Sequence, residues 1–374
     1  MLEPFRRLAR WRRRHPALPL IGDTRTRGER EAAVLRASVK ALGAELVRQR
    51  CDAGMAGPAA KLPPEPVRAG LGSRTCRQAD IEADWLRHWC GRIGIWPAYH
   101  RKVWEVCFIA QAAWEAGALA PGRRALGFAV GREVLPSLFA AAGMEVVATD
   151  LPAGDARARE WRRTGQHAGE GGEDAARAAL FRPGLVGAEE FERRVSFRPV
   201  DMRRIPPDLL GGGFDLVWSS CAMEHLGSLE RGAAFVLDAM RCLRPGGVAV
   251  HTTELNTDAA GGTLRWGTTV LYQRPHLDAL ARRLAQADHA MLPLDDTQGD
   301  GPLDAFVDLP PFAGDGVPGA ATLAALPQPP HLRLSIRGFP ATSVGIVARA
   351  QVIRAGTFSM HYKGTVASVA VGDA

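Results

Sequence analysis

The feature that most constrains the fold is an alternation of short apolar runs with amphipathic stretches, which begins at Arg123. The apolar runs have the length of buried strands and lie at 124–128, 144–150, 195–202, 214–220 and 248–254. Apolar strands interleaved with helices of about 10–15 residues indicate a parallel sheet covered on both faces. We therefore predict an α/β fold with a doubly wound, mostly parallel sheet.

Helical periodicity dominates the part of the chain before this alternation. It predicts helices over 29–50, within 78–94 and within 98–119, and the Pro/Gly/Ala-rich stretch 51–75 predicts a linker. Their Trp and Phe side chains are expected in the core. We predict three units: a helical extension (1–120), a main domain (121–350) with an insertion at 151–194, and a tail (351–374).

Beyond the fifth strand, the sequence predicts one more helix and the last strands of the sheet. The helix is expected within 276–291. Two or three final strands are expected within 302–309 and 331–350.

Composition is that of a soluble globular protein, with 46% hydrophobic and 23% charged residues. No apolar run approaches the roughly 20 residues that a membrane span needs. The six cysteines form no zinc-binding pattern, so we expect reduced thiols, no metal site and a cytoplasmic location.

Positive charge is concentrated at the N-terminus, in the stretch "FRRLARWRRRHP". Phe5, Leu8 and Trp11 have helical spacing there, so residues 1–15 are a candidate for weak contact with an anionic membrane surface. A solvated or frayed terminus is the alternative. The net charge of +7 comes almost entirely from arginine and predicts no specific nucleic-acid partner.

The loop "GFAVGRE" follows the first strand, where doubly wound sheets bind ligands. A dinucleotide fingerprint requires three glycines, but only Gly127 and Gly131 are present, with Ala129 between them. Pyrophosphate binding is therefore disfavoured. A methyl group at position 129 is tolerable in such a turn only if φ stays negative.

Two acids close the next two strands. Asp150 ends the second strand at a position suited to ribose hydroxyls. Asp201 ends the third strand, where its carboxylate could accept from an adenine amino group while Met202 lines the ring. A cofactor without phosphates, S-adenosylmethionine, fits this order of turn, acid and acid.

The order of motifs resembles the class I S-adenosylmethionine-dependent methyltransferases. The resemblance is carried by "LGFAVGRE", "ATD", "VDM", "FDLVWSSCAMEHLG" and "MRCLRPGGVAVHTTE". It covers about 123–254, extends more loosely to about 350, and looks like a bacterial branch with the first motif G-F-x-V-G-x-E. The resemblance implies that Glu133 supplies an acid for the methionine amino group. The predicted cofactor contacts are Gly127, Phe128, Ala129, Gly131, Glu133, Asp150, Leu151, Asp201, Met202, Ser219 and Ser220.

The candidate base is His225, which follows the fourth strand. Methyl transfer needs a positioned nucleophile, and a hydroxyl nucleophile benefits from a histidine base. His225 could instead cap the next helix or pack on the adenosine. Glu224 is expected to orient His225 or bind substrate, with a helix-start carboxylate as the alternative.

Further polar residues are candidates for the acceptor site. Glu254 and Asn256 follow the fifth strand, and His167 lies in the insertion that should roof the cleft, although it could be an ordinary surface-loop histidine. His251 is expected to be a core histidine. "YHRK", at 99–102, could contribute a phosphate or carboxylate contact from Arg101 or Lys102.

These residues together predict a methyltransferase that O-methylates a small molecule or a glycan. A nicotinamide-dependent oxidoreductase is the alternative enzyme. A degenerate, non-catalytic module with this fold, acting through protein contacts, is the alternative from another class. The oligomeric state is left open.

Overall fold

The computed structural model describes residues 26–168, 171–312 and 328–351. The basic segment 1–15 and the tail from residue 352 onward lie outside these ranges, as do the structural expectations for them.

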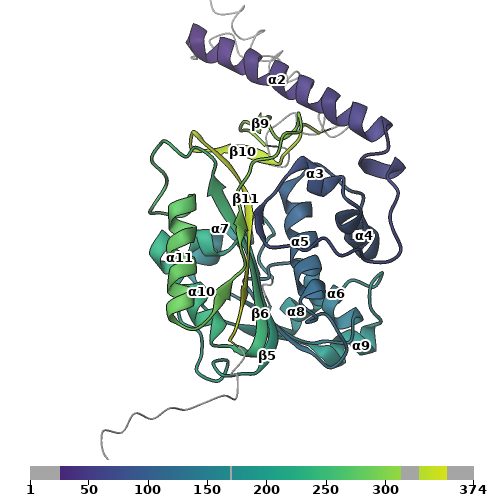
Figure 1. Ribbon diagram of the computed structural model, residues 1–374, viewed down its shortest axis with the longest axis vertical. Coiled ribbons are helices and arrows are strands. Elements are labelled where there is room, and N and C mark those ends of the chain that lie inside the picture. Colours follow the sequence, from purple (N-terminus) through teal and green to yellow (C-terminus); the bar gives the residue numbers. More distant parts are fainter. Residues whose placement is uncertain (1–25, 169–170, 313–327, 352–374) are drawn as a thin grey trace, which may run out of the picture.

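A parallel sheet forms the centre of the molecule (Figure 1). Its strands follow the order β4 (Val195–Pro199), β3 (Glu145–Asp150), β2 (Arg124–Phe128), β5 (Phe214–Ser220) and β6 (Leu243–Asn256). Each of these neighbouring pairs is parallel. The inner strands are buried on both faces, which explains why they are continuous apolar runs. The predicted doubly wound α/β fold is confirmed.

Antiparallel and short strands complete the sheet beyond β6. The long strand β11 (Phe339–Arg349) runs antiparallel to β6, and β10 (Arg333–Ile336) forms a hairpin with it. Three short strands extend this side: β7 (Ala290–Met291), β8 (Leu294–Asp295) and β9 (Val307–Asp308). Of the strand expected within 302–309, only the two residues of β9 are in a strand, because the residues before them form a turn.

The segment expected to be a linker also contributes to this sheet. Its last residues form β1 (Ser73–Thr75), which pairs antiparallel with β11 and parallel with β8. The N-terminal part of the chain is thus hydrogen-bonded to the main sheet.

Helices cover both faces of the sheet (Figure 1). One face carries α10 (Leu229–Met240) and α11 (Arg274–Gln286), and the other carries α4 (Asp84–Ile93), α5 (Arg101–Glu115) and α6 (Leu135–Ala141).

Helix α5 packs directly on the sheet. Its Trp104 and Phe108 stack at 4.7 Å and are fully buried, which confirms the predicted core role of these aromatics. Gly345 of β11 makes room for this packing, because a Cβ there would lie 2.1 Å from the Phe108 ring. The first turn of α5 is thereby held beside the ends of β5 and β6.

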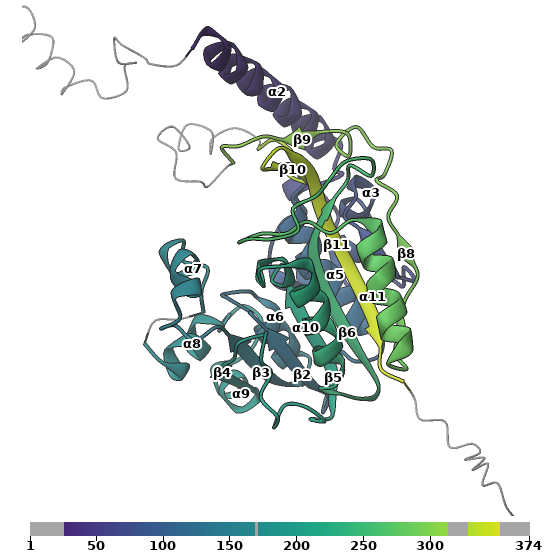
Figure 2. The ribbon, with the colours of Figure 1, turned by 90° about the vertical axis from the view of Figure 1, so that its left-hand side faces the viewer.

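The remaining elements surround this core. Helix α2 (Arg27–Asp52) crosses the end of the molecule near β9 and β10, and α7 (Arg159–Arg163) stands off from the sheet (Figures 1 and 2). The other short elements are η1 (Gly57–Ala59), α3 (Gln78–Ile81), η2 (Ala156–Ala158), α7 (Arg159–Arg163), α8 (Glu173–Ala179), α9 (Ala188–Arg194) and η3 (Met223–His225). Among the described helices, none has both the length and the apolar character needed to span a membrane.

Candidate active site

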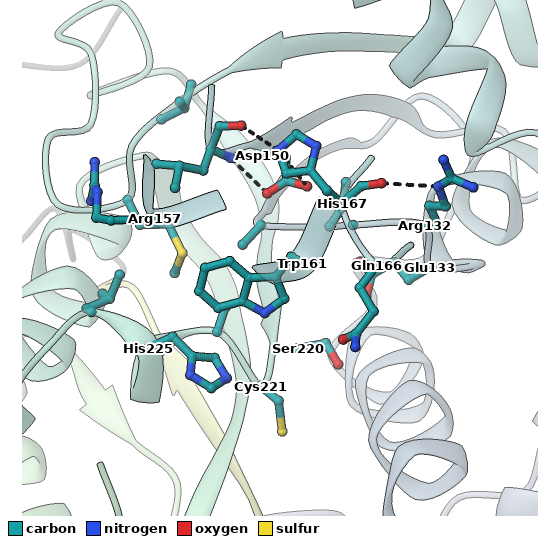
Figure 3. A pocket seen from close by; sticks show the side chains of 18 of the residues that line it. Arg132, Glu133, Asp150, Arg157, Trp161, Gln166, His167, Ser220, Cys221 and His225 are labelled. Atoms are coloured by element: carbon teal, nitrogen blue, oxygen red, sulfur yellow. Dashed lines mark hydrogen bonds and ion pairs between the residues drawn. The ribbon is translucent and has the colours of Figure 1, made fainter. Parts of the chain in front are cut away.

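A cavity of about 640 Å³ opens at the carboxyl ends of the parallel strands (Figure 3). Its volume is in the range of small-molecule sites, roughly 300–1,000 Å³. The first turn of α5, the loops after the strands and the insertion after β3 all contribute to its wall. The lining residues are Arg101, Lys102, Ala129 to Glu133, Asp150, Leu151, Arg157, Trp161, Gly165 to His167, Val200 to Met202, Ser220 to Ala222, His225, Leu226 and Glu254.

The turn after β2 has a left-handed backbone at Ala129, with a φ of 51°. The negative φ that would make an alanine easily tolerated here is therefore not observed. Such a conformation costs a non-glycine residue on the order of 1–3 kcal/mol, and surrounding structure must hold it. The next amide, of Val130, donates to the carbonyl of Thr149 at 3.0 Å and ties the turn to β3.

The two glycines of this turn are required by packing. A Cβ at Gly127 would lie 2.3 Å from the Trp218 ring, and one at Gly131 would lie 2.5 Å from the carbonyl oxygen of Gln166. Gly131 also has a positive φ of 53°. The glycine pattern therefore reflects Trp218 and the insertion as well as any ligand.

Asp150, at the end of β3, holds the insertion in place. Its carboxylate accepts from the amides of Leu151 at 2.8 Å and Ala168 at 3.1 Å. Burial raises the pKa of Asp150 although these hydrogen bonds oppose the shift. His167 lies directly beside it, with Nε2 2.8 Å from the carbonyl oxygen of Leu151. The predicted roof residue His167 is thus part of the wall above Asp150.

Asp201 is engaged by an arginine from the insertion. Nη2 of Arg157 lies 2.8 Å from one carboxylate oxygen of Asp201, and Arg203 lies 3.2 Å from the same atom. Burial raises the pKa of Asp201, but the hydrogen bonds from Arg157 and Arg203 outweigh it and lower the pKa to about 2. The side chain expected to meet adenine is therefore a carboxylate already paired with Arg157.

Glu133 is a partly buried acid on the cavity wall. The indole N–H of Trp218 donates to its Oε1 at 2.6 Å. Burial raises the pKa of Glu133 to about 8, with the Asp150 carboxylate adding to the shift. A further cation beside this carboxyl would favour its charged form.

His225 is held by a backbone carbonyl. Its Nδ1 lies 2.8 Å from the carbonyl oxygen of Thr268, which can only accept, so Nδ1 carries the proton and Nε2 keeps a lone pair. Nε2 lies 3.9 Å from Oε1 of Glu224. The Trp161 ring packs edge-on against the imidazole at 5.3 Å (Figure 3).

Glu224 is fully buried behind His225 and does not line the cavity. Its Oε2 accepts from the hydroxyl of Thr253 at 3.0 Å. Burial raises the pKa of Glu224, while the neighbouring His225 opposes the shift. The structure therefore places Glu224 as a support for His225.

A buried ionic cluster forms the wall beside α5. Arg101 pairs with Glu254 at 2.7 Å and with Glu105 at 3.2 Å, and Lys102 pairs with Glu105 at 3.0 Å. Burial raises the pKa of Glu105, but the two cations outweigh it and lower the pKa to about 2. The sequence analysis did not predict Glu105 as a site residue. Its position three and four residues after two cations on one helix was the signal that could have identified it.

Besides Glu224, four predicted site residues do not reach the cavity wall. Gly127 and Phe128 are part of β2, and Phe128 is fully buried in the core. Ser219 is buried and bonded to Nδ1 of His251 at 2.8 Å, which agrees with the core position expected for His251. Asn256 donates to the carbonyl of Gly262 at 3.1 Å and thereby shapes a turn.

The cavity also contains residues that the sequence did not single out. Those with polar, aromatic or sulfur-containing side chains are Arg132, Arg157, Trp161, Gln166 and Cys221. Trp161 was detectable as an isolated large aromatic in a polar insertion. Cys221 lies directly after β5 and has a strained backbone, with a φ of 44°. Nothing in the sequence indicated this strain. Among the described residues, no group of three or more His, Cys, Asp or Glu side chains is arranged to hold a metal ion.

Residues 126–251 match the family described as a methyltransferase domain. The matched region runs from β2 into β6 and carries most of the cavity wall. With the observed fold, this match supports an S-adenosylmethionine-dependent methyltransferase of class I, and S-adenosylmethionine is its cofactor. A nicotinamide-dependent oxidoreductase is not favoured.

Several solved structures are similar in outline. The [4+2]-cyclase SpnF is 15% identical, with 66% of this chain and 81% of that chain covered and a TM-score of 0.40. The glycopeptide N-methyltransferase MtfA, complexed with sinefungin, is 14% identical, with 66% and 86% covered and a TM-score of 0.37. Magnesium protoporphyrin IX methyltransferase from Synechocystis PCC 6803, with bound SAH, is 10% identical, with 84% and 99% covered and a TM-score of 0.36. Comparison with curated proteins finds no match.

Proposed function

We propose that the protein methylates a hydroxyl group of a small molecule or a glycan, with His225 as the general base. The observation that carries this proposal is the hydrogen bond from Nδ1 of His225 to the Thr268 carbonyl. It leaves the unprotonated Nε2 as the only ring atom able to take a proton. His225 lines the same cavity as the residues suited to the cofactor.

The cavity residues fit S-adenosylmethionine. Asp150 can accept from ribose hydroxyls, and Met202 offers an apolar contact for the adenine beyond the end of β4. At the other end, Glu133 and Lys102 supply opposite charges for an amino-acid group. The raised pKa of Glu133, at about 8, supports this assignment, because a neighbouring ammonium would favour its carboxylate form.

When bound, S-adenosylmethionine would supply an electrophilic methyl group to the acceptor oxygen, and its sulfur would keep the electron pair of the broken carbon–sulfur bond. The chain's own contribution is to orient the acceptor and remove its proton. Nε2 of His225 takes the hydroxyl proton, and the resulting imidazolium is stabilised by Glu224 3.9 Å away. Thr253 holds Glu224 in that position.

The decisive experiment has a binding step and a transfer step. Calorimetry should show binding of S-adenosylhomocysteine and none of NAD. Labelled S-adenosylmethionine should then transfer label to an acceptor pool from a cell extract, and alkaline stability of the product should separate ethers from esters. Label on nitrogen or sulfur contradicts O-methylation. Absence of both binding and transfer would support the non-catalytic module instead.

A further inference from the structure

The cavity wall at the end of β6 contains a carboxylate with one oxygen unused. Glu254 is only 5% exposed and lines the cavity, and Arg101 contacts its Oε1 at 2.7 Å. Its Oε2 accepts no hydrogen bond from the residues that the structure describes. A buried carboxylate oxygen without a partner is costly, so a donor supplied by a ligand would stabilise this site.

The surrounding charges limit which donor fits. Arg101 and Lys102 are both already paired, through Glu105 and Glu254, at 3.2 Å or less. An anionic acceptor would therefore be repelled by the Glu254 carboxylate, because neither of these two cations is free to offset its charge. A cationic acceptor would be repelled by the Arg101 guanidinium, which is already paired with the same carboxylate. A neutral donor, a hydroxyl group, satisfies both conditions.

The base and the unused oxygen lie in one small area. His225 and Glu254 line the same cavity, and the Glu254 carboxylate lies close enough to Glu224 to help raise its pKa, while Glu224 lies 3.9 Å from Nε2 of His225. A ligand that reaches both His225 and Glu254 therefore needs two hydroxyl groups close to each other.

Trp161 adds an apolar surface beside them. Its indole is partly exposed on the cavity wall and packs edge-on against His225 at 5.3 Å (Figure 3). A partly exposed indole offers a broad, polarisable face. The C–H face of a pyranose or cyclitol ring matches such a surface while its hydroxyls point outward.

We infer that the methyl acceptor is a sugar or another cyclic polyol that presents a vicinal diol. The ring packs on Trp161, one hydroxyl donates to Nε2 of His225 and is methylated, and the adjacent hydroxyl donates to Oε2 of Glu254. This inference rests on the proposed O-methyltransferase function and names its substrate class.

The test uses a chemical property of vicinal diols, which periodate cleaves. The acceptor pool of a cell extract is divided, one half is oxidised with periodate and then quenched and reduced, and both halves receive the full-length protein and labelled S-adenosylmethionine. We expect at least a tenfold loss of label incorporation in the oxidised half. If label incorporation survives oxidation, the inference of a vicinal diol is wrong. If the untreated half incorporates no label, the result counts against the methyltransferase function itself.

Two further arms exclude other targets of periodate. Acetylation of amines in the pool should leave incorporation unchanged, because a hydroxyl and not an amine donates to Glu254. Acid hydrolysis of the labelled product should release a mono-O-methyl sugar or cyclitol. Loss of incorporation after acetylation, or label on a phenol or carboxylate, overturns the inference. Mixing oxidised with untreated pool checks that oxidation creates no inhibitor.

Variants assign the two contacts. Glu254→Gln and Trp161→Ala should each raise the KM for the acceptor about 10–100-fold, while affinity for S-adenosylhomocysteine stays within a factor of about two. Trp161→Phe should recover part of the loss, since a flat ring remains. Trp266→Ala is the matched control, because this indole is 72% exposed and lies outside the cavity. An unchanged KM in folded Trp161→Ala and Glu254→Gln variants contradicts the inference.

Discussion

The two ends of the cavity are built in different ways. The end suited to the cofactor consists of side chains at strand ends, such as Asp150 and Asp201, which are satisfied by the insertion that follows β3. The end proposed for the acceptor joins Arg101 and Glu105 of α5 to Glu254 of β6, about 150 residues further along the chain. The first end is assembled locally and the second by the sheet topology. We therefore expect substitutions at the two ends to change different measurable quantities.

The largest expected effect is at the acceptor end. His225→Ala should lower turnover by roughly 10²–10⁴-fold, because the acceptor hydroxyl loses its base. Affinity for S-adenosylhomocysteine, measured by calorimetry, should barely change. His289→Ala, beyond the end of α11 and outside the cavity, is the matched control. If the variant instead loses cofactor affinity and keeps its maximal rate, His225 contacts the cofactor and is not the base.

The next effect belongs to the cofactor end. Asp150→Ala should weaken binding of S-adenosylhomocysteine by about 1–3 kcal/mol, since ribose hydroxyls lose a charged acceptor. The same change removes the acceptor for the Ala168 amide, so the insertion should also loosen. Hydrogen exchange at residues 157–168 measures that second consequence. An unchanged dissociation constant in a folded variant would remove Asp150 from the cofactor site.

The difference between the two ends also explains what the sequence could predict. The alternating strands and their terminal acids are local patterns, so the fold and the positions of Asp150 and Asp201 followed from them. The Arg101–Glu254 pair is a long-range contact, because strands β2 to β5 lie between its two partners in the sequence. Single-sequence periodicity carries no information about such pairs.

Local patterns were also misleading in one place. Gly127 and Gly131 have the spacing of a ligand turn, yet Trp218 and the Gln166 carbonyl already require them. The left-handed backbone of Ala129 was unpredictable for a related reason. It depends on the hydrogen bond from Val130 to β3, a tertiary contact that outweighs the local preference of alanine.

A smaller effect should appear as a pH dependence at the cofactor end. The pKa of Glu133, about 8, is above its ordinary value, so the folded protein binds this proton more tightly than the unfolded chain. The corresponding stability is present at low pH and is lost as the pH rises toward about 8. Cofactor affinity should change in the opposite sense, because an ammonium group favours the carboxylate.

Glu133→Gln separates these two trends. The variant should lose the rise in cofactor affinity between about pH 6 and 8, and its thermal stability should fall less over that interval than that of the wild type. Titration calorimetry in buffers of different ionisation enthalpy should detect proton release on cofactor binding to the wild type. Identical pH profiles for the two proteins would exclude Glu133 from the amino-acid end of the site.

The smallest expected effect on catalysis comes from a segment that belongs to neither end. Deletion of residues 1–15 should leave turnover and cofactor affinity unchanged, since the cavity residues that the structure describes all lie beyond position 100. If the segment contacts membranes rather than being a solvated or frayed terminus, the deletion should remove weak binding to anionic vesicles, worth about 1 kcal/mol per basic side chain near the surface. Sedimentation with phosphatidylserine vesicles at low and high salt measures this binding, and neutral vesicles are the control. Binding that persists at high salt after deletion would instead implicate the exposed Val34, Leu35 and Leu42 of α2.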